Sequence, residues 1–281
     1  GVHFDFLKRL HAKIETLKLY GQEINLITSA IARMNMFMHG IEEFDIVRGN
    51  TLSNPGFLEN DELRKFNVIL ANPPYSIKSW DRKSFENDPF GRNVWGTPPQ
   101  GCADYAFQQH IQKSLDPKIG RAVVLWPYGV LFRDSEHEMR QKMLEQDLVE
   151  CVIALGKNLF YNSIMESCLL ITNNNKSTER KGKVLFIDAR EELKREKTIS
   201  YLLQEHIERI HSAYRNFESE EGFSYVAEIS EIAEKESSLN VPLYVKGNGI
   251  EHLTPNQAYK QWVASSSALK ESVTQLFEVL K

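Results

Sequence analysis

The stretch FNVILANPPY, residues 66–75, is the part of the chain from which the fold is most readily inferred. Residues 68–71 form an uninterrupted apolar run, which is typical of a strand in a sheet covered on both faces. Two consecutive prolines follow at Pro73 and Pro74, and they cannot continue a strand ladder because proline has no backbone N–H. The stretch therefore predicts a buried strand that ends in a rigid turn carrying Asn72 and Tyr75.

Similar strand-like runs recur along the chain and alternate with helical segments up to about residue 147. The further runs are KLYGQEIN (18–25), FDIVRGN (44–50), GRAVVLWPYGVLF (120–132), LVECVIALG (148–156), ESCLLITNN (166–174) and GKVLFIDARE (182–191). Helical spacing of apolar residues is found at 4–18, 28–39, 104–115 and 134–146. This order predicts an α/β fold, in which a largely parallel sheet with helices on both faces ends in a hairpin-like edge.

The character of the sequence changes after about residue 195. Residues 199–217, 229–236 and 254–281 have helical patterns, and the last of these is predicted to be one long terminal helix. We therefore predict an α/β region over residues 1–195 and a helical region over residues 196–281. The helical region is expected to serve packing and subunit contact.

Composition narrows the classes of function. The chain has 281 residues and a net charge of −4, so it lacks the basic excess of a protein that grips DNA alone. No apolar run approaches the roughly 20 residues that span a bilayer, so no membrane association is expected. The cysteines Cys102, Cys151 and Cys168 are widely spaced, which predicts reduced thiols in the cytoplasm and neither a disulfide framework nor a zinc site. The histidines have no partners at metal-ligand spacing, and no metal is assigned.

The chemistry of Asn72-Pro73-Pro74-Tyr75 suits a planar group with an exocyclic NH2. The proline carbonyls and the Asn72 side-chain oxygen are acceptors held in a fixed conformation, and an aromatic ring lies beside them. Each N–H of an amino group could donate to one acceptor while the ring stacks on its plane. Taken alone, the four residues would favour a proline-rich turn in which Asn72 only caps a loop, but their context at the end of an apolar strand does not.

The surrounding blocks resemble a known family. LYGQEIN, ARMNMFMHGI, GNTLSNP, VILANPPYSIKSW, ADYAFQQHI, GRAVVLWPYGVLFR, LVECVIALGKNLFYNS, KGKVLFIDAREE and LNVPLYV are similar, in this order, to blocks of the modification (M) subunit of type I restriction-modification systems. The resemblance covers almost the whole chain. It implies a doubly wound sheet of the S-adenosylmethionine-dependent methyltransferase type, and methylation of adenine N6 in DNA.

The resemblance also implies roles for individual residues. Asn72 and Pro73 of the Asn-Pro-Pro-Tyr motif would accept hydrogen bonds from N6 of a flipped adenine, and Tyr75 would stack on it. Glu23 would accept from ribose hydroxyls of the cofactor S-adenosylmethionine, and Ile24 would pack on its adenine. Asn50 stands where the family usually has an aspartate that contacts the cofactor adenine amine, so weaker binding is expected.

The residues around this motif allow several readings. In the loop 76–101, three aromatic residues suit either contact with the flipped base or DNA or packing in the core or lid, namely Trp80, Phe90 and Trp95. Four cations suit either a phosphate-facing lid or a solvated loop, namely Lys78, Arg82, Lys83 and Arg92. Asp104 precedes a helical run and is predicted to be its N-cap.

The expected partners are those of the family: DNA, a specificity subunit, a second M subunit and, in some complexes, a restriction subunit. The family's glycine-rich turn before the helix at residues 4–18 has no counterpart here, so the chain is expected to correspond to the C-terminal part of an M subunit that lacks the first strand. We expect such a chain to be inactive alone. Two alternatives remain: a non-catalytic module that docks on a specificity subunit, and a methyltransferase for protein glutamine or cytosine N4.

Overall fold

The computed structural model describes residues 17–160, 165–196 and 199–246, together with Tyr259, Trp262, Val263 and Ser266. The chain divides into one unit of residues 1–245 and a second of residues 246–281. The division lies after Val245, whereas the sequence predicted a boundary after residue 195. The predicted terminal helix falls almost entirely outside the described residues, so the account below concerns the first unit.

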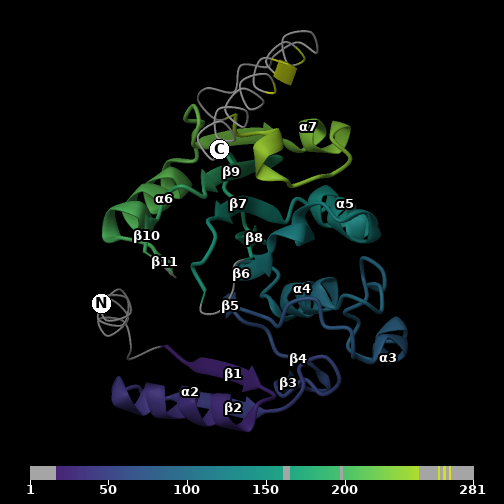
Figure 1. The fold of residues 1–281 in the computed structure, drawn as a ribbon. Coiled ribbons are helices and arrows are strands. Elements are labelled where there is room, and N and C mark those ends of the chain that lie inside the picture. The colour runs from purple at the N-terminus through teal and green to yellow at the C-terminus, as the bar shows by residue number, and fades with distance from the viewer. Residues whose placement is uncertain are drawn as a thin grey trace, which may run out of the picture. The chain divides into compact units, whose positions relative to one another are not determined.

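A six-stranded sheet forms the centre of this unit (Figure 1), in the order β12-β9-β7-β8-β6-β5. Its strands are β5 (Val68–Ala71), β6 (Arg121–Pro127), β7 (Val149–Leu155), β8 (Ser167–Asn173), β9 (Lys183–Ala189) and β12 (Ser224–Glu228). The pairs β5–β6 and β7–β9 are parallel, and β8 is antiparallel to both β6 and β7. Four strands therefore share one direction and only β8 and β12 oppose it, which confirms the mostly parallel α/β prediction.

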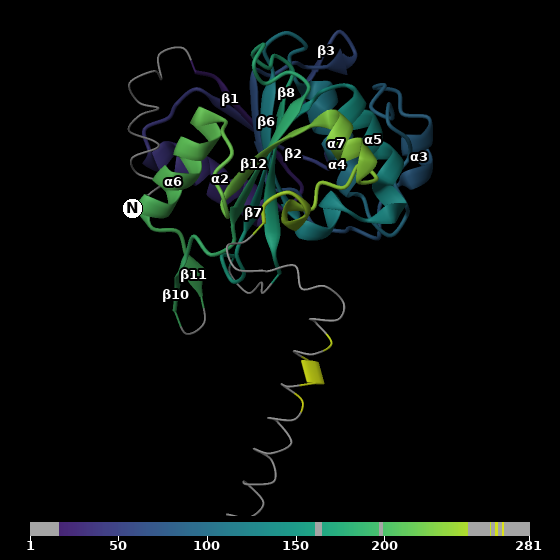
Figure 2. The same ribbon diagram turned by 90° about the horizontal axis from the view of Figure 1, so that it is seen from above.

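Helices cover both faces of the sheet (Figure 2). They are α4 (Asp104–Ser114), α5 (His137–Glu145) and α7 (Ile229–Glu234) on one face and α6 (Gln204–Asn216) on the other. Alternate residues of β6 serve the two cores, because successive side chains of a strand point to opposite faces. Val124 and Trp126 belong to the cluster under α4 and α5, whereas Leu125 belongs to the cluster under α6.

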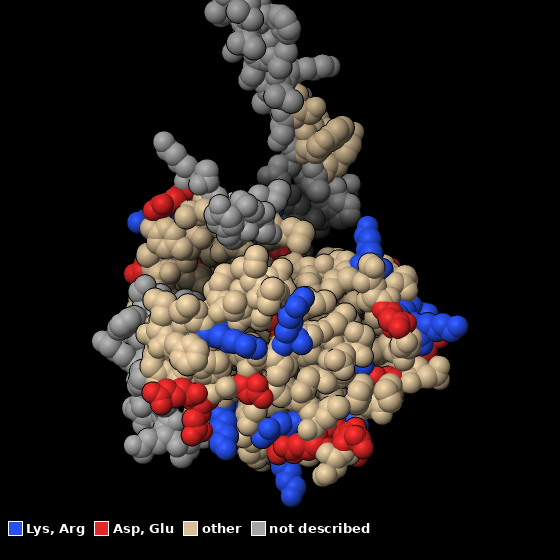
Figure 3. Space-filling model, turned by 90° about the horizontal axis from the view of Figure 1, so that it is seen from below, with Lys and Arg blue, Asp and Glu red and all other residues tan. Residues whose placement is uncertain are grey.

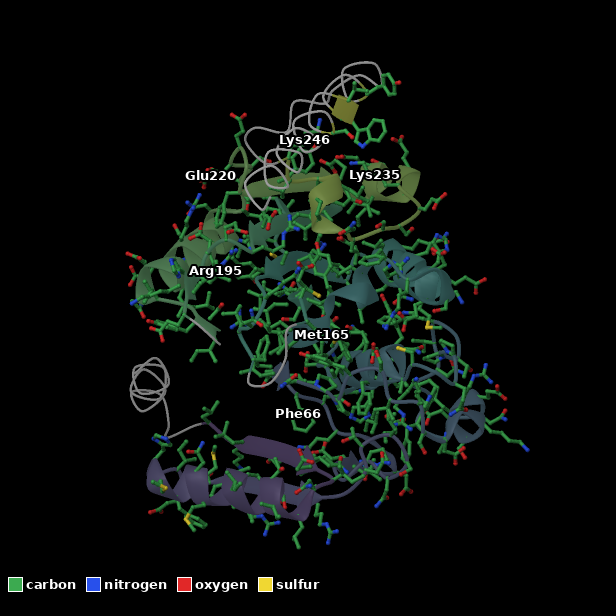
Figure 4. The ribbon with its side chains drawn as sticks, in the orientation of Figure 1. Phe66, Met165, Arg195, Glu220, Lys235 and Lys246 are labelled. Carbon is green, nitrogen blue, oxygen red and sulfur yellow. The ribbon has the colours of Figure 1, made fainter. Side chains whose placement is uncertain are left out.

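A separate sheet is formed by the parallel strands β1 (Leu19–Glu23) and β2 (Phe44–Arg48), on which α2 (Leu26–Met38) packs. Aromatic contacts link it to the chain before β5: the Tyr20 ring lies 5.5 Å from Phe66 and 5.3 Å from Phe57. Figure 4 labels Phe66, which lies between the two sheets. The start of β1 is thus held close to the start of β5.

Neither β1 nor β5 is paired on its second edge within the described ranges. Figure 1 draws β1 on the side of β2 that faces β5. The sequence predicted that β5 would be covered on both faces, but Val68 is 50% and Leu70 65% exposed. That expectation was wrong for the described part of the chain, where β5 is an edge strand and no helix packs on these two side chains.

The remaining elements are short. They are the hairpins β3 (Leu58–Glu59)–β4 (Glu62–Leu63) and β10 (Lys194–Arg195)–β11 (Ser200–Tyr201), helix α3 (Arg82–Glu86), and the 3-10 turns Tyr128–Leu131, Asp134–Glu136 and Val241–Leu243. The sequence analysis missed β12, which pairs antiparallel with β9 and brings residues after 196 into the main sheet. No helix in the described part of the chain is long and apolar enough to cross a membrane.

Candidate functional site

The Asn72–Tyr75 motif begins directly after β5, where the predicted rigid turn is found. Asn72 is exposed, and its side chain makes no hydrogen bond to any described residue. Pro73 is buried and Pro74 is exposed. The side-chain oxygen of Asn72 and the adjacent carbonyls are thus acceptors at a strand end, the part of an open α/β sheet where ligands bind.

Tyr75 closes the motif and is partly buried. Its ring packs on the core cluster beneath α6, which includes Leu125 and the half-buried Leu169. Burial, with the nearby Cys168 and Asp104, raises the pKa of Tyr75 to about 12. The phenol therefore stays neutral at any physiological pH, and the packing holds the ring in place.

A buried carboxylate fixes the residue that follows. Ser76 has φ +48°, a left-handed conformation that is unusual for a residue with a side chain. Its backbone N–H donates to Asp104 Oδ1 at 2.7 Å, and Asp104 is completely buried. The predicted N-cap role of Asp104 is wrong: Ala103 is the N-cap residue of α4, and Asp104 points to the Ser76 turn instead.

The predicted cofactor residues Glu23 and Ile24 lie at the end of β1. Glu23 Oε1 accepts from the Asn25 N–H at 2.8 Å, and Asn25 caps α2 through its own side chain. The other carboxylate oxygen of Glu23 makes no hydrogen bond to described residues, and Ile24 is 59% exposed. An acceptor beside an exposed apolar side chain fits the adenosyl half of the predicted cofactor.

Asn50 lies at the same end of the β1–β2 sheet, since the N–H of Gly49 donates to Glu23 O at 3.1 Å. The Asn50 side-chain oxygen accepts from the N–H groups of Leu52 and Ser53, at 3.0 and 3.3 Å. That oxygen, which was expected to meet the cofactor amine, already shapes the loop after β2. The cofactor contact of Asn50 stays a prediction.

Arg92 joins the loop after β2 to the long loop after the motif. It is 2% exposed and ion-pairs with the buried side chain of Asp88. Its guanidinium also donates to the carbonyls of Thr51 at 3.1 Å and Leu52 at 2.7 Å. The prediction that Arg92 faces phosphate is wrong, because these contacts use its donors inside the protein.

The aromatic residues of the long loop also turn inward. Trp95 is completely buried, and its Nε1–H donates to Gln146 at 3.0 Å. Trp80 packs beside Phe85, with ring centroids 5.8 Å apart. Of the two readings offered for these tryptophans, the structure supports packing.

His110 of α4 contacts Arg92 of this loop and makes the stability of the fold depend on pH. Arg92 Nη1 lies 3.3 Å from His110 Nδ1, and burial followed by the charge of Arg92 lowers the pKa of His110 to about 3. The unfolded chain binds this proton near pH 6.5, so stability is fully present above that pH and falls as the pH drops toward 3. Between pH 7 and pH 5 we expect the His110 contribution to lower the free energy of unfolding by at most about 2 kcal/mol.

Urea unfolding of the wild type and of His110→Gln at both pH values would measure this effect. The glutamine variant should lose up to about 2 kcal/mol less than the wild type over the same interval. Equal losses in the two proteins would contradict the assignment.

The structure brings the predicted residues into two groups. Glu23, Ile24 and Asn50 share one end of the β1–β2 sheet, and Asn72–Tyr75 end β5. No hydrogen bond or ring contact between described residues joins the groups directly, and Arg92 connects them only through the loops. Sequence reasoning missed the inward role of Arg92, since a charged residue in a loop gives no signal of burial.

Comparisons with known proteins show the family to which the chain is similar. The family model "N-6 DNA Methylase" matches residues 2–252. The methylase subunit of the type I restriction enzyme MjaVII of Methanocaldococcus jannaschii is 35% identical over 239 residues, which are 81% of this chain and 40% of that protein. The HindI methylase subunit of Haemophilus influenzae is 36% identical over 189 residues, 66% of this chain and 41% of that protein.

Solved structures point the same way. The crystal structure of a type I restriction-modification methyltransferase subunit from Streptococcus thermophilus has a TM-score of 0.76 and 32% identity, covering 82% of this chain and 49% of that one. This chain therefore spans less than half the length of each of these three relatives. Because the family model covers nearly the whole chain, and the relatives are those that the sequence blocks resemble, the chain belongs to the N-6 DNA methylase family.

Proposed function

We propose that the chain is the part of an S-adenosylmethionine-dependent DNA methyltransferase that binds the target adenine and methylates its N6. The observation that carries the proposal is the Asn72–Tyr75 motif: an exposed Asn72 without a hydrogen bond, a rigid proline turn and a neutral, packed tyrosine at a strand end. Family membership supports the reaction class.

The acceptors of the motif would do most of the chemical work. The lone pair of an adenine amine is conjugated into the ring and is a poor nucleophile. If Asn72 and the Pro73 carbonyl accept its two N–H bonds, the nitrogen is drawn toward tetrahedral geometry and its lone pair is no longer delocalised into the ring. This is catalysis by positioning and electrostatics, and it needs no strong base.

S-adenosylmethionine would supply an electrophilic methyl group. On this chain, Glu23 would accept from the ribose hydroxyls and Ile24 would cover the cofactor adenine, while the loop fixed by Asn50 and Arg92 would form the adjoining wall. The described residues offer no group that we assign to the methionine half.

DNA would be engaged with the help of partners. The target atom is inside the duplex, so the base must be flipped out to reach Asn72. On the face drawn in Figure 3, Lys and Arg are interspersed with Asp and Glu, and no continuous basic patch is seen. A specificity subunit, a second M subunit and, where present, a restriction subunit would then supply much of the phosphate neutralisation. A cytoplasmic location stays a prediction.

A second candidate is a non-catalytic assembly module. The second edges of β1 and β5 have no strand partner among the described residues. Co-purification with a specificity subunit, without methyl transfer under any of the conditions below, would favour this candidate.

Product analysis tests the proposal. The chain, alone and with an upstream segment of a type I relative supplied in trans, would be incubated with isotope-labelled S-adenosylmethionine and unmethylated genomic DNA. Labelled N6-methyladenine in the nucleoside digest is the expected product, chiefly with the added segment. Labelled N4-methylcytosine, or labelled glutamine in an added protein substrate, would overturn the assignment to adenine.

A further inference from the structure

A largely buried cluster of charged and polar residues includes Ser76, the residue that follows the Asn72–Tyr75 motif. Its members are Ser76, Cys102, Asp104, Arg133 and Glu136, from the motif turn, the start of α4 and the turn before α5. Three of these residues, Cys102, Asp104 and Glu136, are buried and lie close enough to suggest a metal site. Arg133 already serves both carboxylates, so a guanidinium takes the central place in the cluster.

The contacts form a chain from the protein core to the motif. Arg133 Nη2 donates to Asp104 Oδ2 at 2.6 Å, and its Nε donates to Glu136 at 2.7 Å. The buried Arg140 holds the Arg133 carbonyl at 2.8 Å. Asp104 then uses its other oxygen to accept from the Ser76 N–H. Every link is anchored on α4, α5 or the turn between β6 and α5.

The left-handed conformation of Ser76 indicates what this series of contacts does. A left-handed conformation in a residue other than glycine persists only where the surroundings fix it, and such residues gather at functional sites. Here the fixing groups are a fully buried carboxylate and a contact of 3.3 Å from Arg133 Nη1 to Ser76 Oγ. Ser76 directly follows Tyr75, so its conformation sets the path of the chain as it leaves the motif.

We propose that Asp104 and Arg133 are positioning residues, which hold Ser76 in its left-handed conformation and so keep the Asn72–Tyr75 turn in the geometry that receives a target base. The inference rests on the proposed function for its catalytic consequence, but its structural part does not. Neither residue is expected to touch substrate or cofactor.

The sharpest variant is Asp104→Asn. An amide of the same shape has one acceptor, so it can serve either Ser76 N–H or Arg133, and its NH2 group then faces the other donor. Arg133→Lys is a milder companion, because an ammonium cannot bridge the two carboxylates in the forked geometry of a guanidinium. Glu150→Gln is the matched control: Glu150 is also buried, faces an arginine (Arg180, 3.4 Å), and lies in β7 away from the motif.

Hydrogen exchange at the Ser76 amide, measured by NMR on the full chain, tests the structural part. Asp104→Asn should speed this exchange by about tenfold or more, which corresponds to the loss of one hydrogen bond to a charged group. Arg133→Lys should have a smaller effect in the same direction, and Glu150→Gln should leave the Ser76 amide unchanged. The proposal would be overturned if neither Asp104→Asn nor Arg133→Lys changed the exchange rate, or if Glu150→Gln changed it equally.

The catalytic part is read from the enzyme completed with the upstream segment. Asp104→Asn should lower kcat by about 10- to 100-fold with KM for the cofactor within about twofold, since only the placement of the target base is disturbed. A parallel change in kcat and cofactor KM would show general damage and contradict positioning. If no methyl transfer is obtained from any form, the proposed function fails, while the exchange result still decides whether Asp104 holds Ser76.

Discussion

Asn72→Ala is expected to lower kcat for adenine methylation by about 10²- to 10³-fold in the completed enzyme, the usual loss when one preorganised polar group is removed from a reacting centre. The side-chain oxygen of Asn72 is exposed at the end of β5 and has no competing hydrogen bond among described residues. Its removal leaves one N–H of the target amine without an acceptor, so the lone pair stays conjugated with the ring and remains a poor nucleophile. Single-turnover methyl transfer measures this step directly.

The control for this prediction is Asn175→Ala, which removes an exposed amide from the turn after β8. It should change kcat by no more than about twofold, because the residue lies outside the motif. Surface substitutions of this kind also leave the free energy of unfolding nearly unchanged. Unfolding curves of the two variants should coincide with that of the wild type. A kcat that survives Asn72→Ala would show that the motif is only a turn.

The strand that ends in this motif was predictable, because a run of apolar residues stopped by two prolines has few other solutions. The other strands of the six-stranded sheet before β12 were predicted because each is also a run of mainly apolar residues. Strand β12 was missed because its sequence, SYVAE, is short and lies between helical patterns. Strand β12 forms by pairing with β9, which is distant in the sequence, and the residue pattern within one segment does not reveal such a partner.

The sequence-based predictions were wrong chiefly about charged residues that turn out to be buried. Asp104 was predicted to be a cap and Arg92 a phosphate contact, and both are buried in ion pairs. Arg133, the partner of Asp104, is distant in the sequence and is brought to it by tertiary folding. Asp88 precedes Arg92 by only four residues, but that spacing predicts no ion pair in a loop. The strand ends carrying Glu23 and Asn50 were identified through resemblance, since an acidic or amide residue after a strand is common in any α/β protein.

The open edges of β1 and β5 lead to the second large effect. Supplying a strand that pairs with both edges is expected to turn a chain with no measurable S-adenosylmethionine binding into one that binds it saturably. The Tyr20–Phe66 contact already holds the starts of β1 and β5 near one another. The relatives extend well beyond the matched region, so they have chain available to provide such a strand.

The added strand is expected to be parallel to both neighbours and apolar, because interior strands of a parallel sheet are buried on both faces. The hydrogen bonds of the ladder on both of its edges, together with partial cover of the neighbouring side chains Val68 and Leu70, would stabilise this unit. Addition of the peptide should therefore raise the melting temperature of the chain as well as create cofactor binding.

Calorimetric titration of the cofactor, with and without a peptide carrying the upstream strand and glycine-rich turn of a relative, measures the effect. A peptide with proline at the centre of the strand is the matched control, since proline cannot donate to the ladder. Strong cofactor binding by the chain alone would show that the edges of β1 and β5 need no partner. Stabilisation without cofactor binding would separate the two roles of the segment: the strand would complete the sheet, while the pocket would depend on the residues that follow it. Because β1 carries Glu23 and β5 leads to Asn72, only a strand seated between them would fix the cofactor residues and the target-base residues in one frame.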